Sequence, residues 1–461
     1  MKKQDNCKGL TKKFLNYLLP SISAMWVFSI YTMVDGIFVG KRVGPIAIAA
    51  VNLSMPFINT IFGIALLIAI SSSTLISIFL GRKETQKSNE LFTLHIIILL
   101  VLATVITSLS LLFLENLATF LGADARTLDY VKDYLQIIIT FSVFFMVAYS
   151  LEVLVKTDGF PTYAIVFVSV AAATNIILDY VFVMVFNYGI KGAALATGIS
   201  QLVSCLGLLA HFLIGKSKLK FVKVKFDWNI VKSMFTIGFP DAVTEFSAGI
   251  TVYLYNYILL RYIGADGIAA FSVIMYLNNL VIMTMVGITQ GMQPLVSFFY
   301  GGGDKESIKR IFHMALKSVT MASILFIAVS QCFTDELISM FIDSSNNTIY
   351  QLSKEALHIF SFSFLLCGFN IVISGYFTAR KETKKATLIS MLRGLILIAA
   401  FVLILPPVWG GLGIWISSIF NEMATLLISL LLLTRSKSSM EQKDRRRIFF
   451  QRMTRMMMEK S

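Results

Sequence analysis

The chain alternates long apolar runs with short polar segments. Twelve runs each hold more than 20 mostly apolar residues, about the length that a helix needs to cross a bilayer. Because lipid cannot satisfy the edge amides of an open strand, each run predicts a helix. The second and eighth runs are long enough to tilt or to project beyond the bilayer. The predicted spans are 14–38, 46–80, 91–114, 131–156, 162–186, 192–214, 233–260, 267–300, 311–333, 351–378, 386–407 and 412–434.

Composition narrows the class of protein to one that resides in a membrane. Hydrophobic residues make up 56% of the 461 residues and charged residues only 14%, against roughly 25% in a soluble domain. These figures exclude a soluble enzyme, a disordered chain, a collagen-like fibre and a coiled coil. The sequence therefore predicts an all-α membrane protein with twelve transmembrane helices.

The positions of the basic residues predict the orientation. With both termini in the cytoplasm, the inner segments hold 31 of the 40 Lys and Arg residues and the outer loops hold seven. This bias follows the positive-inside rule and predicts a multi-pass protein of the cytoplasmic membrane. It also accounts for the net charge of +14 without a nucleic-acid partner, since cationic loops face anionic lipid.

An internal repeat divides the chain into halves. At an offset of 220 residues, Pro20 aligns with Pro240 and Gly81 with Gly301. Six spans are an even number, so both copies run the same way and are related by an axis along the membrane normal, as in some transporters. The expected segments are a cytoplasmic N-terminus 1–13, an N-lobe 14–214, a cytoplasmic linker 215–232, a C-lobe 233–434 and a basic cytoplasmic tail 435–461.

Acidic side chains inside spans are costly and usually mark a pathway. Asp35 lies near the outer end of the first span, and Asp179 lies deep in the fifth. Asn175 is one helical turn from Asp179 and shares its face, so the two can bind a proton or a small cation. The structural alternative is a helix–helix hydrogen bond that only stabilises the bundle.

Two further carboxylates favour contact with substrate. Glu152 precedes Lys156 by four residues, so a structural ion pair competes with a substrate contact, and Lys156 can reach water at the inner end. Glu245 has no basic residue one turn away, which suits an organic cation or proton coupling. Gln290 and Gln293 are predicted to line the same cavity, with interhelical hydrogen bonding as the alternative.

The repeat does not duplicate the carboxylates. Asp35 aligns with Tyr255, and Asp179, which follows one inserted residue in the repeat, aligns with Ala400. The N-lobe is therefore expected to carry ion coupling. The C-lobe is expected to supply Glu245 and a substrate-binding wall rich in Phe, Tyr and Met, including Tyr255.

Motifs for other classes of protein are missing from the sequence. There is no GxxxxGK[ST] phosphate loop, no GxSxG elbow and no HExxH motif. An integral-membrane enzyme would need a catalytic cluster at an interface, and the sequence contains none. We therefore expect neither enzymatic activity nor a cofactor.

Several segments together resemble the multidrug and toxic compound extrusion (MATE) family over essentially the whole chain. They are 33–50, 175–180, 189–201, 238–245 and 287–294. The resemblance implies a two-lobed antiporter with twelve helices in two six-helix bundles. Such proteins expel amphipathic, often cationic compounds in exchange for H⁺ or Na⁺.

The resemblance also implies an ion site. In one branch of the family an Asp, an Asn, an Asp and a Thr form it, and Asp35, Asn175, Asp179 and Thr197 fall on those positions, with Asp35 and Asp179 as the Na⁺ ligands where the ion is Na⁺. Glu152 resembles a glutamate near the end of the fourth helix in related bacterial members.

The function expected from the sequence is a secondary efflux antiporter that acts as a monomer on small amphipathic compounds. The rival is a lipid-linked oligosaccharide flippase of the same two-lobed plan. A flippase would need a cationic central cavity for pyrophosphate. The candidate cavity charges here are mostly acidic, which favours the exporter.

Overall fold

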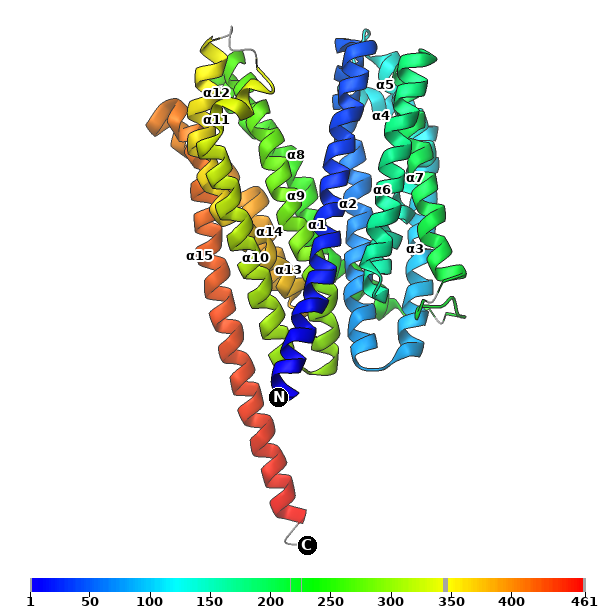
Figure 1. The fold of residues 1–461 in the computed structure, drawn as a ribbon, viewed down its shortest axis with the longest axis vertical. Coiled ribbons are helices and arrows are strands. Elements are labelled where there is room, and N and C mark those ends of the chain that lie inside the picture. Colours follow the sequence, from blue (N-terminus) through cyan, green and yellow to red (C-terminus); the bar gives the residue numbers. More distant parts are fainter. Residues whose placement is uncertain (1, 216, 225, 343–346, 459–461) are drawn as a thin grey trace.

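The computed structural model describes residues 2–215, 217–224, 226–342 and 347–458, and every regular element among them is a helix (Figure 1). The first half forms α1 (Lys2–Arg42), α2 (Pro45–Gly81), α3 (Thr85–Leu112), α4 (Leu114–Phe120), α5 (Leu128–Asp158), α6 (Pro161–Asp179), the π-helix η1 (Tyr180–Val185) and α7 (Gly189–Leu213). The second half forms α8 (Trp228–Tyr262), α9 (Ala265–Gly302), α10 (Lys305–Cys332), α11 (Thr334–Ser339), α12 (Asn347–Phe360), the 3-10 helix η2 (Ser361–Ser363), α13 (Phe364–Ala379), α14 (Thr383–Met391), the π-helix η3 (Leu392–Ile396) and α15 (Leu397–Met458).

These elements confirm a multi-pass fold consistent with twelve spans. Ten helices of the described chain are long and apolar enough to cross a membrane. One of the ten, Thr383–Ser436, contains two of the predicted spans, which part at Gly410 where the backbone leaves helical geometry (φ 59°, ψ −141°). The remaining span is α8, whose 35 residues are long enough but include Asp241 and Glu245.

The helices form two lobes. In Figure 1, α1 to α7 make one lobe and α8 to α15 the other, and the lobes diverge toward the end that carries the α1–α2 and α8–α9 connections. Both connections end in a glycine with the same unusual backbone, Gly44 at φ 103° and Gly264 at φ 95°. These residues are partners in the 220-residue repeat, so the repeat is visible in the backbone as well as in the sequence.

At the opposite end the lobes touch through glycines. A β-carbon placed on Gly81 of α2 would lie 1.9 Å from the Phe298 carbonyl oxygen of α9, and one on Gly301 would lie 2.1 Å from the Ile78 carbonyl oxygen. Each contact is the image of the other under the 220-residue offset. Only glycine lets two helix backbones approach so closely, so this end of the molecule is closed by a nearly two-fold symmetric junction.

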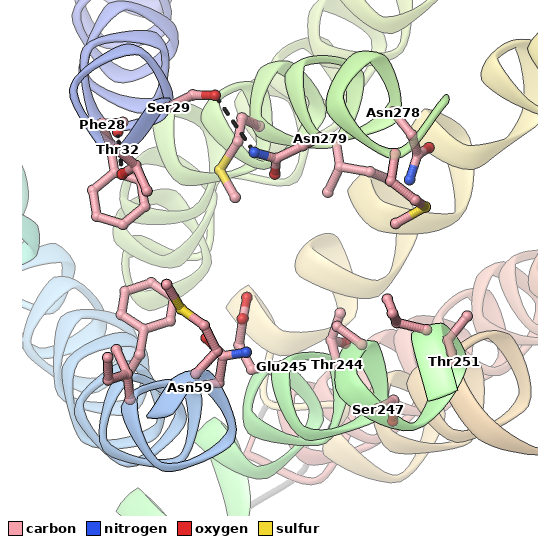
Figure 2. A pocket seen from close by; sticks show the side chains of 18 of the residues that line it. Phe28, Ser29, Thr32, Asn59, Thr244, Glu245, Ser247, Thr251, Asn278 and Asn279 are labelled. Atoms are coloured by element: carbon pink, nitrogen blue, oxygen red, sulfur yellow. Dashed lines mark hydrogen bonds between the residues drawn. The ribbon is translucent and has the colours of Figure 1, made fainter. Parts of the chain in front are cut away.

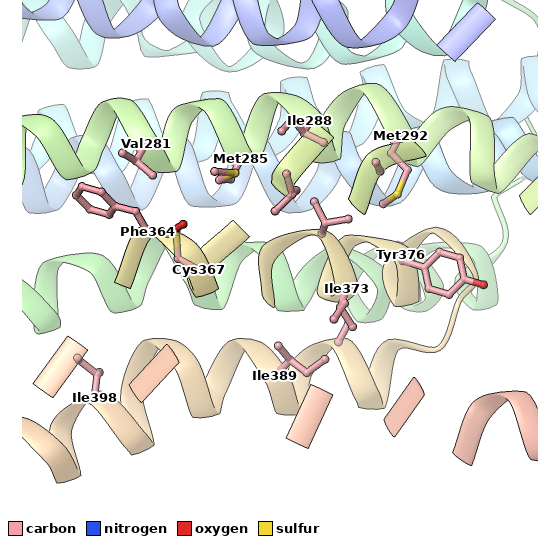
Figure 3. Packing of buried hydrophobic residues seen from close by; sticks show 14 of the residues in the cluster. Val281, Met285, Ile288, Met292, Phe364, Cys367, Ile373, Tyr376, Ile389 and Ile398 are labelled. Carbon is pink, nitrogen blue, oxygen red and sulfur yellow. The ribbon is translucent and has the colours of Figure 1, made fainter. Parts of the chain in front are cut away.

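The C-lobe core lies between α9 and α13. Figure 3 shows Val281 and Met285 of α9 beside Phe364 and Cys367 of α13. Farther along α9, Met292 lies on the side of Ile373 and Tyr376, and α14 and α15 add Ile389 and Ile398. The same buried cluster includes side chains from the first half of α1, so α1 packs against the C-lobe near the closed end. Because this core is closely packed, it holds the C-lobe helices that face the N-lobe in fixed positions.

The segment between α7 and α8 is tied to the N-lobe. The backbone amide of Lys218 donates to Asp158 Oδ1 at 3.0 Å, and that of Lys220 donates to Asn89 Oδ1 at 3.1 Å. The amide of Val222 donates to Thr93 Oγ1 at 3.0 Å. Because α7 ends at Leu213 and α8 begins at Trp228, the connection is shorter than the predicted linker 215–232. The predicted tail begins inside α15, which continues to Met458.

Candidate functional site

A cavity of about 490 Å³ lies between the two lobes. Figure 2 shows Glu245 of α8 pointing into it beside Asn59 of α2, opposite Ser29 of α1 and Asn279 of α9. Asn279 Nδ2 donates to Ser29 Oγ at 3.5 Å across the lobe boundary. Asn59 and Asn279 are partners in the repeat, so the two copies contribute matching amides to opposite sides of one cavity.

The N-lobe wall brings the four predicted ion-site residues together. Asn175 Nδ2 of α6 donates to Thr197 Oγ1 of α7 at 3.3 Å. The carboxyl groups of Asp35, on α1, and Asp179, at the end of α6, lie against each other. Asp35 and Thr197 line the central cavity, whereas Asn175 and Asp179 are fully buried behind it.

Oxygen atoms in this cluster have no hydrogen-bond partner among the described residues. They are Asp35 Oδ1, Asn175 Oδ1 and both carboxylate oxygens of Asp179. Two adjacent carboxylates repel one another, and burial of a polar group without a hydrogen-bond partner costs roughly 2–7 kcal/mol, or more when the group is charged. A proton or a hard cation such as Na⁺ would supply what is missing, and carboxylate, amide and hydroxyl oxygens suit it. No group of three His, Cys, Asp or Glu side chains in the described chain could hold a metal, so Na⁺ would depend on this mixed set.

Two tyrosines beside the cluster were not predicted. Tyr134 of α5 is 4% exposed and lies within the electrostatic field of both Asp35 and Asp179. Tyr31 of α1 accepts a hydrogen bond from Gln201 Nε2 at 3.4 Å. The π-helix η1 begins directly after Asp179, and such wide turns occur often at functional sites. No local sequence pattern distinguishes these tyrosines from ordinary packing residues.

A second carboxylate, which was not among the predicted site residues, lies next to Glu245. Asp241 lies one turn earlier on α8, and its Oδ2 atom has no partner in the described structure. Both residues line a second, smaller cavity of about 130 Å³, and Glu245 also lines the central one. The sequence could have indicated this residue, because Asp241 is a carboxylate inside the predicted span 233–260.

Glu152 forms a buried ion pair that joins the lobes. Lys156 Nζ donates to Glu152 Oε1 at 2.6 Å and to Gln290 Oε1 of α9 at 3.0 Å. Gln290 Nε2 in turn donates to Tyr149 OH at 3.2 Å. The expectation that Lys156 reaches water is wrong: it is 1% exposed because the other lobe covers it.

The other predicted substrate residues divide between the two cavities. Gln290 and Gln293 line the smaller cavity together with Glu245, and Gln293 Nε2 has no partner in the described chain. Tyr255 lines the central cavity, with its ring stacked on Phe271 at a centroid distance of 4.7 Å.

The C-lobe wall also carries an ion pair that was not predicted. Arg393 Nε, in η3, lies 2.8 Å from Glu422 Oε1 of α15, and both residues line the central cavity. The two residues lie on separate helices 29 positions apart, so no helical spacing in the sequence reveals the pair.

Comparisons with known proteins agree with this architecture. A model of the MatE family matches residues 20–181 and 246–404. The Multidrug export protein MepA of Staphylococcus saprophyticus subsp. saprophyticus is 24% identical over 425 residues, covering 91% of this chain and 93% of that protein. The protein of the same name from Staphylococcus aureus is 24% identical over 426 residues with the same coverage, 91% and 93%.

A solved structure with the same fold is the outward-facing conformation of a multidrug resistance MATE family transporter of the MOP superfamily. It matches with a TM-score of 0.90 over 94% of this chain and 97% of that one. At 21% sequence identity the likeness is one of fold.

Proposed function

The chain belongs to the MatE family, the multidrug and toxic compound extrusion transporters, and from this premise we propose that it is a secondary antiporter that exports amphipathic cations in exchange for H⁺ or Na⁺. The relatives named Multidrug export protein MepA support an efflux role. Family members are membrane transporters rather than enzymes, and the proposed cycle needs no cofactor besides the coupling ion.

The observation that carries the proposal is the position of the carboxylate cluster on the cavity wall. Asp35 lines the same cavity as Glu245, while Asp179 lies buried behind it with both oxygens unpartnered in the described structure. A proton or Na⁺ entering from outside would fill the cluster and favour the state that releases substrate outward. Ion and substrate need no shared contact, because a coupling free energy of about 1–3 kcal/mol suffices.

The cavity suits an amphipathic cation. Its lining includes the aromatic side chains of Phe28, Phe62, Phe145 and Tyr255, with Glu245 as a carboxylate that points inward. A volume of about 490 Å³ lies in the range of pockets that hold drug-sized ligands. Aromatic faces attract organic cations, and the carboxylate adds a charge of opposite sign.

The proposed setting is the cytoplasmic membrane with both termini inside. The basic inner segments lie at the closed end, so the diverging ends of the lobes face outward and the described conformation is the releasing state. One chain supplies the whole cavity, and the proposed unit of function is a monomer in contact with lipid.

The charges of the cavity lining disfavour the flippase alternative. A pyrophosphate headgroup calls for a cationic lining, but Asp35 and Glu245 are acidic. The cationic side chain of Arg393 is matched by Glu422. These charges favour the exporter.

The test is transport of ethidium into inverted vesicles under separately imposed H⁺ and Na⁺ gradients. Wild-type protein is expected to accumulate the dye under at least one gradient. Asp179→Asn removes the buried charge with little change in volume and is expected to reduce gradient-driven uptake at least tenfold while inserting normally. Asp129→Asn is the matched control, because Asp129 is exposed at the start of α5. Full uptake by Asp179→Asn would show that the ion-site assignment is wrong.

A further inference from the structure

We propose that the closed end of the molecule binds a phosphate group between Arg82 and Lys381, and that this ligand bridges the two lobes and stabilises the described conformation. The phosphate belongs to a lipid headgroup or to a soluble compound. Neither residue lines the central or the smaller cavity, so the inference concerns a place apart from the proposed transport site.

Two turns at the closed end share one sequence. Residues 82–85 read Arg-Lys-Glu-Thr, and residues 380–383 read the same. The first turn joins α2 to α3 in the N-lobe, and the second joins α13 to α14 in the C-lobe. They are not partners in the 220-residue repeat, so the common plan of the two lobes does not explain the match.

The two turns also share one backbone conformation. Lys83 and Lys381 have positive φ angles of 64° and 60°, which residues other than glycine adopt rarely. The amides that follow, those of Glu84 and Glu382, each donate at 2.9 Å to the carbonyl oxygen five positions earlier. The same residue types therefore occupy the same backbone positions on the two lobes.

Helix α9 brings the two turns together across the junction between the lobes. A β-carbon on Gly81, directly before the first turn, would lie 1.9 Å from the Phe298 carbonyl oxygen. The adjacent residue Ser297 donates through Oγ to the carbonyl oxygen of Ala379, directly before the second turn, at 3.0 Å. Neighbouring residues of one helix thus contact the start of both turns.

Arg82 and Lys381 are cations of opposite lobes that approach one another at this junction. Partial burial lowers the pKa of Lys381 below its ordinary 10.5, and the charge of Arg82 lowers it further. Within the described residues neither side chain forms an ion pair. Repulsion between the two charges opposes closure of the lobes at this end.

The glutamates of the two turns are paired with other cations of their own lobes. Glu84 Oε2 lies 2.8 Å from Lys87 Nζ. Glu382 Oε1 lies 2.8 Å from Arg380 Nη2, and its Oε2 accepts from Lys385. An external anion would therefore satisfy two cations that the described chain leaves without a counter-charge.

The chemistry of the pair suits a phosphate group. Two phosphate oxygens can accept parallel hydrogen bonds from the edge of a guanidinium, while a third meets the ammonium group as a point charge. Because the ligand is held by both lobes, its binding favours the conformation in which Arg82 and Lys381 are close. The basic segments at this end raise the local concentration of such anions.

The test measures two properties of the purified full-length protein in nanodiscs. They are the midpoint of thermal unfolding, which rises when a ligand binds the folded state, and the distance between spin labels on the diverging ends of the lobes. One arm adds inorganic phosphate to nanodiscs of phosphatidylcholine, with sodium chloride of equal ionic strength as the reference. The other arm replaces part of the phosphatidylcholine with phosphatidylglycerol.

We expect at least one arm to raise the midpoint and to increase the population with long distances. A response to inorganic phosphate identifies a soluble ligand, and a response to phosphatidylglycerol alone identifies a lipid headgroup. No rise of the midpoint in either arm would overturn the proposal.

Charge-removing variants assign the response to the pair. Arg82→Gln and Lys381→Asn each remove one exposed charge, and asparagine tolerates the positive φ at this position. Each is expected to raise the half-saturating concentration of the active phosphate compound at least tenfold. Lys83→Asn is the matched control, because it makes the same change at the same backbone conformation. Equal losses in Lys83→Asn and Lys381→Asn would indicate diffuse attraction and would also overturn the site.

A charge reversal supplies the missing anion within the chain. Lys381→Glu places a carboxylate beside Arg82, and we expect it to populate the long distances without any phosphate and to make both measurements insensitive to phosphate. A response of Lys381→Glu as large as that of wild type would contradict the proposal. None of these measurements uses an ion gradient, so their outcome is independent of the proposed antiport.

Discussion

Lys156 and Glu152 show how a charged pair survives inside the bundle. They are 1% and 6% exposed, and the network that satisfies them includes Gln290 from the other lobe. Removing two charges from water costs several kcal/mol per ion, which a close pair with extra hydrogen bonds offsets only in part. Through Gln290 the pair joins the two lobes, and Glu152 also lines the smaller cavity, where its predicted contact with substrate stays a prediction.

A buried pair of this kind predicts an asymmetry between single and double variants. Lys156→Met leaves Glu152 buried without its cation and is expected to cost about 3–5 kcal/mol of stability. Combining Lys156→Met with Glu152→Leu is expected to recover most of that loss. Thermal unfolding of the purified protein measures both. Equal losses in the single and double variants would contradict the structural role.

Sequence alone predicts contacts along one helix better than contacts between helices. Asn175 and Asp179 are four residues apart, so helical periodicity predicts that they share a face. The approach of Asp35 to Asp179, the position of Tyr134 and the Arg393–Glu422 pair depend on how separate helices pack. Nothing in the local pattern fixes that packing.

At the scale of elements, helix ends are set by polar residues that hydropathy does not detect. The third span was predicted from residue 91, but α3 begins at Thr85 because its first turns are polar and extend beyond the apolar run. The π-helices η1 and η3 also fall inside apolar runs, where no residue pattern signals a wider turn. Apolar length predicts that a helix exists, but it does not place the ends of that helix.

Asp304 caps the N-terminus of α10, and its contribution to stability can be measured. Asp304 Oδ1 accepts from the Ser307 backbone amide at 3.0 Å, and Oδ2 accepts from the Ser307 hydroxyl at 2.6 Å. These hydrogen bonds, that of the hydroxyl first, lower the pKa of Asp304 below its ordinary 3.8. The stabilisation is therefore present above that pH and is lost as the pH falls through the lower folded-state pKa.

Asp304→Ala is expected to destabilise the protein by about 1 kcal/mol at pH 7, the usual value for a lost cap. The difference from wild type should be smaller at pH 3, below the ordinary value of 3.8, because the unfolded chain then binds a proton more readily than the folded protein does. Asp304→Asn keeps an accepting oxygen and should retain most of the stability with less dependence on pH. Thermal unfolding at both pH values measures this, and a deficit for Asp304→Ala that is as large at pH 3 as at pH 7 would count against the cap.

For the whole molecule, the repeat predicted two lobes, and the structure adds how they meet. The lobes close on each other where Gly81 and Gly301 pack against the opposite backbone. The repeat in the sequence aligns these two glycines. It does not predict that α2 and α9 touch there, because this contact is between the two copies of the repeat and not within one copy. Which end is closed depends on packing between the lobes and not on the pattern within either.

The glycine junction should control the balance between conformations. Gly81→Ala and Gly301→Ala would each place a β-carbon about 2 Å from a carbonyl oxygen of the opposite lobe. Alanine is favoured over glycine in a helix by about 1 kcal/mol. A loss of the described state in these variants would therefore come from the contact between the new β-carbon and the opposite lobe. We expect both variants to lower the population of the described state, seen as shorter spin-label distances between the diverging ends. Gly249→Ala, which meets nothing within 4 Å, is the control, and unchanged distances in all three would refute the role.

The tie between the linker and the N-lobe limits how far the molecule can open at its closed end. The chain is held at Val222 by Thr93 and enters α8 at Trp228. Six residues reach at most about 20 Å when fully extended. The connection therefore limits the separation of the lobes at this end. Either the lobes separate by no more than about this length, or the hydrogen bond between Val222 and Thr93 of α3 breaks.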